Sequence, residues 1–157
     1  MTQEFPAGRM QLGDEAPKPL MAAMVRLESS IELEDRLHHL LSLRASQING
    51  CAFCIDMHWK DARAAGELEE RLYSLDAWRE SPVYDRRERA ALELCEAMTL
   101  ISEGHVPDGV WEQASDALGE ELAQVVFAIA AINTWNRLMI TTRAEPGHYE
   151  PGMLAAA

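Results

Sequence analysis

The chain has 157 residues, of which 48% are hydrophobic and 25% are charged, so it is long enough to form one domain with a buried core. Acidic side chains number 26 against 14 basic ones, which gives a formal net charge of −12 at pH 7. A surface of this sign repels the phosphates of nucleic acids and anionic lipid headgroups, so we expect neither nucleic acid nor a membrane as a partner.

No stretch of the sequence contains the roughly 18 consecutive apolar residues that a transmembrane helix requires. The most apolar stretch, 122–132, contains Gln124 and continues into Asn133, which favours a buried core helix. Residues 1–14 lack the basic segment and the apolar run of a secretory signal, so we expect no export. The three cysteines are an odd number, which a disulfide-rich secreted fold does not usually contain. We therefore expect a cytoplasmic protein.

The sequence predicts a single all-α domain with an irregular segment at each end. Residues 1–19 contain several glycines and prolines and show no helical period, so we expect an extended N-terminal arm. Residues 20–145 show helical periodicity with short interruptions, which predicts a helical bundle. Residues 146–157 show no period and should form an irregular tail, and the sequence contains no strand pattern or internal repeat.

The N-terminal part of this domain should contain a short helix over 20–28 and a longer one after it. Ser29 with Glu32 three residues later is a capping-box pattern, which predicts the start of the longer helix. Asn49 and Gly50 should end it, because both residue types accept the left-handed conformation of a C-terminal cap. The apolar stripe between these ends consists of Leu33, Leu37, Leu40 and Leu41.

The rest of the domain should consist of five further helices. Asp85 with Glu88 repeats the capping-box pattern and predicts a long helix that continues to Ile101. Residues 78–84 contain a proline and should form a connection. The other helices are expected over 51–66, 67–75, 108–118 and 120–142.

Cys51, Cys54 and His58 are the residues in this sequence best suited to chemistry. In a helix that begins at Cys51, their side chains lie within about 60° of one another around the axis. Thiols in the first helical turn are close to free backbone N–H groups and to the positive end of the helix dipole, which lowers a thiol pKa. His58 lies one turn after Cys54 and can accept its proton, so the pattern favours a reactive thiolate.

Two other interpretations of the Cys51–Cys54 pair stay open at this point. Free cysteines are often inert buried residues, and a pair with this spacing is common. Two cysteines and a histidine are also ligands of a tetrahedral zinc site. Such a site needs a fourth ligand from outside the helix, which His38 or His39 could supply.

The remaining cysteine, two other histidines and two amides have structural interpretations. Cys95 lies in a predicted core helix, and His105 and His148 lie in predicted loops, where we expect them to be solvated. Asn133 and Asn136 interrupt the most apolar helix. Because buried amides need hydrogen-bond partners, we expect them to bond to backbone groups where two helices or two subunits meet.

Several separate runs of the sequence resemble one known family. The run LRASQINGCAFCIDMH at 43–58 resembles the core of the carboxymuconolactone decarboxylase superfamily, and more narrowly its alkylhydroperoxidase D-like branch. The resemblance covers roughly 31–143, and the CxxC with its trailing histidine is the part that concerns function. The supporting runs are KDARAAG at 60–66, LDAWRESP at 75–82, RERAAL at 87–92 and AAINTWNR at 130–137.

The resemblance implies a helical domain that assembles into homo-oligomers, with a trimer or hexamer favoured. It also implies that Cys54, paired with His58, attacks a peroxide and that Cys51 then closes the disulfide and meets the reductant. Proteins of this branch usually have a glutamate in the proton relay twelve residues before the first cysteine, and that position is His39 here. An imidazole can also transfer a proton.

The leading hypothesis is therefore a thiol-dependent peroxidase that reduces hydroperoxides and is regenerated by a dithiol reductant or a redox partner protein. It needs no cofactor, because the two thiols supply the electrons. One alternative is a non-redox decarboxylase of the same superfamily, although such chemistry has no need of two adjacent thiols. The other alternative is a metal-binding or interaction module that uses the same residues.

Overall fold

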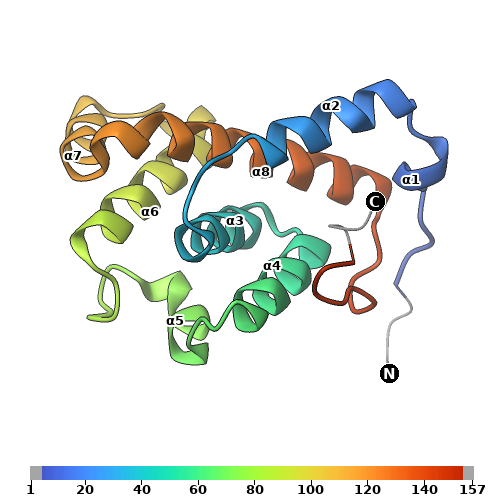
Figure 1. Ribbon diagram of the computed structural model, residues 1–157, viewed down its shortest axis with the longest axis horizontal. Helices are drawn as coiled ribbons and strands as arrows, with labels where there is room; N and C mark the ends of the chain where they lie inside the picture. Colours follow the sequence, from blue (N-terminus) through green and yellow to red (C-terminus); the bar gives the residue numbers. More distant parts are fainter. Residues whose placement is uncertain (1–4, 154–157) are drawn as a thin grey trace.

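The structure is a computed structural model and describes residues 5–153. Within this range the regular elements are helices and no residue lies in a strand, which confirms the predicted all-α single domain (Figure 1). The helices are α1 (Leu12–Glu15), α2 (Lys18–Ser29), α3 (Asp35–Asn49), α4 (Ala52–Ala64), α5 (Glu69–Tyr73), α6 (Arg86–Thr99), α7 (Asp108–Leu118) and α8 (Leu122–Thr142). Three short 3-10 turns, η1 (Leu75–Ala77), η2 (Ile101–Glu103) and η3 (Gly119–Glu121), complete the set.

Helix α3 is the centre of the bundle, because α4, α6 and α8 all pack against it (Figure 1). Leu37, Leu40 and Leu41 of the predicted stripe are fully buried there, and Leu33, just before the helix, packs against the same core. Burial of each leucine contributes about 1.5–3 kcal/mol. The core continues into α6 and α8 through Leu92, Leu94, Val125 and Ile129.

The predicted extended arm contains helical structure. Helix α1 forms one turn within it, and α2 begins at Lys18, two residues earlier than expected. Pro19 does not prevent this start, because the first turn of a helix needs no backbone N–H bond and tolerates the fixed φ of proline. The arm is also tied to α8, since the backbone N–H of Arg9 donates to the carbonyl oxygen of Thr142 at 2.8 Å.

One of the two predicted capping boxes is wrong and the other is confirmed. Ser29 ends α2 instead of starting α3, because its hydroxyl donates back to the Arg26 carbonyl at 3.2 Å, an alternative open to any serine in a helix. At the start of α6, Asp85 accepts from the N–H of Glu88 at 2.8 Å, and the Glu88 carboxylate accepts from the N–H of Asp85 at 2.9 Å. Helix α6 then ends at Thr99, before the predicted limit.

A network of amides joins α3 to α8. The side-chain amide of Asn49 donates to Asn133 at 3.0 Å and to Asn136 at 2.9 Å. Asn136 is fully buried and donates to the Ser46 hydroxyl at 3.0 Å, which in turn donates to the Ser42 carbonyl at 2.7 Å. The expected contact between helices is therefore present, but most partners are side chains and not the backbone groups that we expected.

Helix α8 leaves an apolar face uncovered. The stretch Asp108–Thr142 includes an 18-residue window with a mean hydropathy of 1.2, of which 33% is buried. In length and composition it is the one candidate membrane span in the described part of the chain, and a core helix can meet the same criterion. Phe127 is 57% exposed on this helix, and the neighbouring helix α2 has no buried residue (Figure 1). Two adjacent helices thus present apolar side chains to the outside.

Candidate active site

The turn between α3 and α4 places the cysteine pair. Gly50 ends α3 with φ of +71°, a conformation that costs glycine little because it has no Cβ, so the predicted cap is confirmed. The backbone N–H of Cys51 then donates to the Ser46 carbonyl at 3.0 Å. Cys51 is the N-cap of α4, and its sulfur accepts from the N–H of Cys54 at 3.3 Å. Both sulfurs therefore lie at the positive end of this helix.

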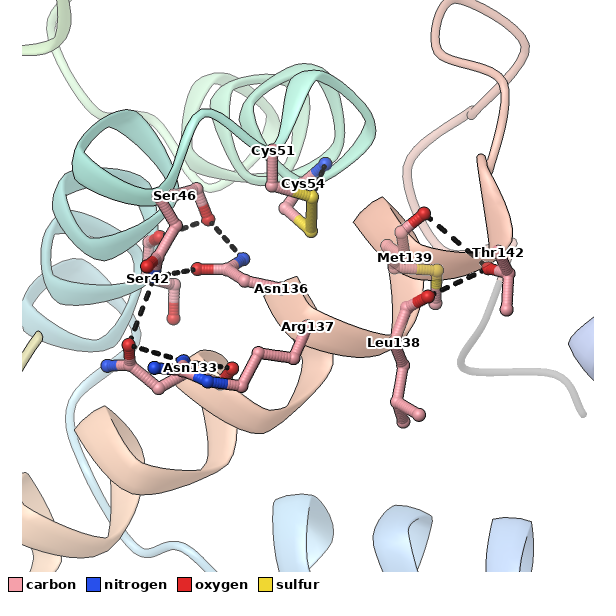
Figure 2. Close-up of a disulfide and its surroundings, with 11 residues drawn as sticks. Ser42, Ser46, Cys51, Cys54, Asn133, Asn136, Arg137, Leu138, Met139 and Thr142 are labelled. Atoms are coloured by element: carbon pink, nitrogen blue, oxygen red, sulfur yellow. Dashed lines mark hydrogen bonds between the residues drawn. A yellow bond between two sulfur atoms is a disulfide. The ribbon is translucent and has the colours of Figure 1, made fainter. Parts of the chain in front are cut away.

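Cys51 and Cys54 are joined by a disulfide on the side of the turn that faces α8 (Figure 2). Their Cα atoms are 5.3 Å apart, inside the usual range of about 4.4–6.8 Å for such a bond. Each residue is only 1% exposed. Cys51, which the resemblance assigns to meeting the reductant, is therefore no more exposed than Cys54, because the turn packs against α8 through the amide network.

His58 is buried beside the cysteines without a polar partner. It lies one turn after Cys54 on α4 and is 8% exposed. Neither ring nitrogen has a hydrogen-bond partner among the described residues. Burial lowers the pKa of His58 to about 3, and the nearby His39 and His38 act in the same direction. In the disulfide form His58 is thus a neutral imidazole.

His39 is a neighbour of this buried histidine and is itself less deeply buried. Its ring centroid is 6.3 Å from that of His58, and the side chain is half-buried on α3. Burial lowers the pKa of His39, as does His38, while the carboxylates of Asp61 and Asp35 partly oppose the shift. No direct hydrogen bond joins the two rings, so a proton that passes between them needs a bridging group such as water.

The C-terminal tail is fastened to the same helix, which sequence reasoning missed. The hydroxyl of Tyr149 donates to both carboxylate oxygens of Asp61, at 2.8 and 3.0 Å, and burial together with this carboxylate raises the pKa of Tyr149 to about 12. Lys60 donates to the Tyr149 carbonyl at 2.9 Å, and Asp56 accepts from the N–H of Gly147 at 3.1 Å. The available signal was an aromatic residue in a tail that otherwise has no periodicity.

The remaining candidates lie apart from this group. Cys95 is fully buried in the core, as expected, and burial raises the pKa of its thiol to about 12. His105 and His148 are exposed, also as expected. His38, one proposed zinc ligand, instead lies 3.1 Å from the Glu28 carboxylate. Across residues 5–153 no three His, Cys, Asp or Glu side chains gather closely enough to hold a metal ion.

The fold and the site together define an all-helical protein with a redox-capable cysteine pair at a helix N-terminus. Residues 18–97 match the carboxymuconolactone decarboxylase family. The uncharacterised protein YdfG of Bacillus subtilis is 43% identical over 122 residues, which cover 77% of this chain and 83% of YdfG. The chain belongs to the carboxymuconolactone decarboxylase family and, within it, to the alkylhydroperoxidase D-like branch.

Solved structures agree with this assignment. ATU0492 from Agrobacterium tumefaciens, a protein of unknown function proposed to be the antioxidant defence protein AhpD, is 39% identical with a TM-score of 0.85, covering 91% of this chain and all of that one. A variant of the debrominase Bmp8 in complex with 2,3,4-tribromopyrrole has a TM-score of 0.76 over 87% of this chain and 74% of that chain. At 19% identity, this second likeness shows the fold alone.

The burial of His58 predicts that the disulfide form loses stability in acid. The imidazole has its usual pKa of 6.5 in the unfolded chain and about 3 in the folded protein. Below pH 6.5 the unfolded chain therefore binds a proton that the folded protein does not. Stability is at its full value above pH 6.5 and falls toward pH 3, by about 1.4 kcal/mol per pH unit from this group alone.

Urea unfolding of the oxidised protein between about pH 7 and pH 4 measures this dependence. His58→Gln should remove roughly that slope from the profile. His148→Gln changes an exposed histidine and should keep the slope of the unmodified protein. An equal slope in all three proteins would contradict the assignment of the acid sensitivity to His58.

Proposed function

We propose that the protein is a thiol-dependent peroxidase that reduces hydroperoxides through Cys51 and Cys54. The observation that carries this proposal is the Cys51–Cys54 disulfide at the N-terminus of α4, with the buried His58 one turn further along the same helix. A cysteine pair that can cycle between dithiol and disulfide supplies the two electrons that reduction of an O–O bond requires. The similarity to a protein proposed to act in antioxidant defence supports the same reading.

Cys54 is proposed as the attacking residue because it alone stands one turn before His58. In the reduced protein a thiolate at Cys54 places a negative charge beside His58, which raises the pKa of the imidazole from its low value in the disulfide form. His58 can then hold the proton that leaves the thiol. When the thiolate attacks the terminal oxygen of the hydroperoxide, the O–O bond breaks and His58 protonates the alkoxide that leaves as an alcohol.

Cys51 is proposed to complete the cycle. The attack leaves Cys54 as a sulfenic acid, and the Cys51 sulfur displaces its hydroxyl group to form the disulfide and water. The N–H of Cys54 at 3.3 Å from the Cys51 sulfur favours a thiolate at this N-cap position. One hydroperoxide and two thiols thus yield one alcohol, one water and one disulfide, which an external dithiol reduces. Because both cysteines are 1% exposed, the reductant needs a local opening of the site.

His39 is proposed to connect His58 with solvent. It is half-buried, lies 6.3 Å from His58 between ring centroids, and is influenced by the Asp61 carboxylate that Tyr149 holds in place. In this role His39 returns a proton to the buried imidazole after each turnover, through a bridging water. The imidazole here takes the position that a glutamate occupies in the relay implied by the family resemblance.

Serine variants of the two cysteines test the division of roles. Cys54→Ser should abolish hydroperoxide consumption, because the attacking sulfur is gone. Cys51→Ser should still permit one oxidation and should accumulate a sulfenic acid at Cys54, since the resolving sulfur is missing. Mass spectrometry after brief exposure of each reduced variant to hydroperoxide detects the added oxygen.

The assignment would be reversed if oxygen were added at Cys51 in the Cys54→Ser variant and none were added at Cys54 in the Cys51→Ser variant. If neither cysteine reacts faster than free cysteine does, the peroxidase proposal fails. Decarboxylase chemistry or metal binding by the same residues then becomes the better explanation. Cys95→Ser is the matched control and should react as the unmodified protein does, because Cys95 is fully buried in the core away from the pair.

We also propose that the chain forms a homo-oligomer, in which a second copy covers the apolar faces of α2 and α8. Phe127 at 57% exposure lies on this surface. Light scattering at micromolar concentration should give a mass that is a multiple of 17.6 kDa, with a trimer or hexamer expected from the family resemblance. Phe127→Glu should reduce the mass, whereas Tyr73→Glu, at an exposed aromatic residue on α5, should not. A 17.6 kDa species for the unmodified protein would contradict the proposal.

A further inference from the structure

Asp61 and His39 lie at a similar level of the hairpin that α3 and α4 form. Gly50 and Cys51 alone separate the two helices, which pack against each other (Figure 1). So short a turn leads α4 back along α3. His39 comes eleven residues before Gly50 and Asp61 comes eleven residues after it, so both lie at a similar distance from the turn. His58 precedes Asp61 by three residues, which puts both on the same side of α4.

The carboxylate of Asp61 has a charge that no cation neutralises. Its hydrogen bonds come from the Tyr149 hydroxyl, at 2.8 and 3.0 Å, and no lysine or arginine in the described part of the chain forms an ion pair with it. Asp56 on the same helix, by contrast, has the ammonium group of Lys60 at 2.9 Å. Burial lowers the pKa of His39, and the charge on Asp61 opposes this shift. The free charge of Asp61 therefore acts on His39.

Asp61 is the better placed of the two carboxylates that oppose the low pKa of His39. Asp35, in the first turn of α3, is exposed, so water and salt screen its charge. Asp61 is half-buried, and its charge is screened less. The other titratable neighbours are His38, which adds to the effect of burial on the pKa of His39, and the neutral His58.

Tyr149 holds the Asp61 carboxylate from the C-terminal tail. Its side chain is 5% exposed, and burial together with this carboxylate raises the pKa of Tyr149 to about 12. The hydroxyl therefore keeps its proton and remains a donor at physiological pH. The tail is itself fixed, because Lys60 donates to the Tyr149 carbonyl at 2.9 Å and the N–H of Gly147 donates to Asp56 at 3.1 Å. The tail thus fixes an acidic group on the helix that begins at the cysteine pair.

We propose that Asp61, held in place by Tyr149, is a positioning residue that supplies the negative charge beside His39 when His39 passes a proton to His58. The inference rests on the proposed peroxidase function and adds Asp61 and the C-terminal tail to the site. His39 takes up a proton from solvent, and the carboxylate stabilises the imidazolium. The ring becomes neutral again when it passes a proton to His58 through the bridging water. The acidic group thus comes from α4 and not from position 39, where the resemblance places a glutamate.

Asp61→Asn tests the charge, because the amide keeps the size of the side chain and an oxygen that can accept from Tyr149. NMR titration of the imidazoles in the oxidised protein should show a lower pKa for His39 than in the unmodified protein, and this measurement does not depend on catalysis. His39→Gln identifies the signal. Tyr149→Phe should lower the pKa of His39 by a smaller amount, because the released carboxylate can turn toward water. Glu145→Gln removes an exposed carboxylate from the tail and should leave the pKa of His39 unchanged.

The rate of hydroperoxide consumption gives a second readout. Asp61→Asn should lower kcat/KM by about tenfold near pH 8, less than the factor of about 10²–10⁴ that a proton donor itself contributes. Part of this loss relative to the unmodified protein should disappear near about pH 6, because the lower pH restores the imidazolium. Asp61→Glu restores the carboxylate and should recover most of the rate at both pH values. A loss of equal size at both pH values would show a merely structural role and contradict the proposal.

The results separate this inference from the function beneath it. If Asp61→Asn changes neither the pKa of His39 nor kcat/KM while hydroperoxide is still consumed, the role of Asp61 is refuted and the peroxidase proposal stands. If Asp61→Asn lowers the pKa of His39 but the unmodified protein consumes no hydroperoxide, Asp61 remains the charge partner of His39 and the peroxidase proposal fails. An unchanged pKa of His39 in Tyr149→Phe would contradict the role of the tail.

Discussion

The attachment of the α3–α4 turn to α8 is the interaction on which the site depends. Gly50 reverses the chain in a left-handed conformation, and the amide of Asn49 beside it bonds to α8. Asn136 completes the attachment through Ser46, whose backbone also fixes Cys51 at the N-cap of α4. Removal of one buried amide would leave its partners unsatisfied at a cost of about 1–3 kcal/mol. These polar contacts therefore stabilise the packing of α3 against α8 and also fix the position of the sulfurs.

Burial at this turn determines the protonation state of His58 in the disulfide form. His58 is enclosed without a carboxylate partner, so the disulfide form keeps it neutral. In the proposed cycle, a thiolate at Cys54 in the reduced protein provides the negative charge that favours the imidazolium. The proposal thus couples protonation of the histidine to the redox state of the cysteine pair. The half-buried His39 gives the enclosed ring a neighbour that is nearer to solvent.

Short sequence patterns predicted the features that depend on residues close in the sequence, such as the Asn49–Gly50 cap that ends α3 and the capping box at Asp85 that begins α6. The capping box predicted at Ser29 was wrong because a serine hydroxyl can donate to a carbonyl of its own helix as well as cap the next helix. The burial of Cys51 depends on α8, far away in the sequence, so helical spacing could not reveal it. Tyr149 likewise finds its partner on α4 only in the folded chain.

The most direct measurement is a count of thiols in the denatured protein before and after the reduced form reacts with one equivalent of cumene hydroperoxide. The chain has three cysteines, and reaction at the pair should remove two thiols while the buried Cys95 keeps its own. One molecule of alcohol should form for each pair of thiols lost. Three remaining thiols, or loss of the thiol at Cys95 while Cys51 and Cys54 stay reduced, would contradict this account.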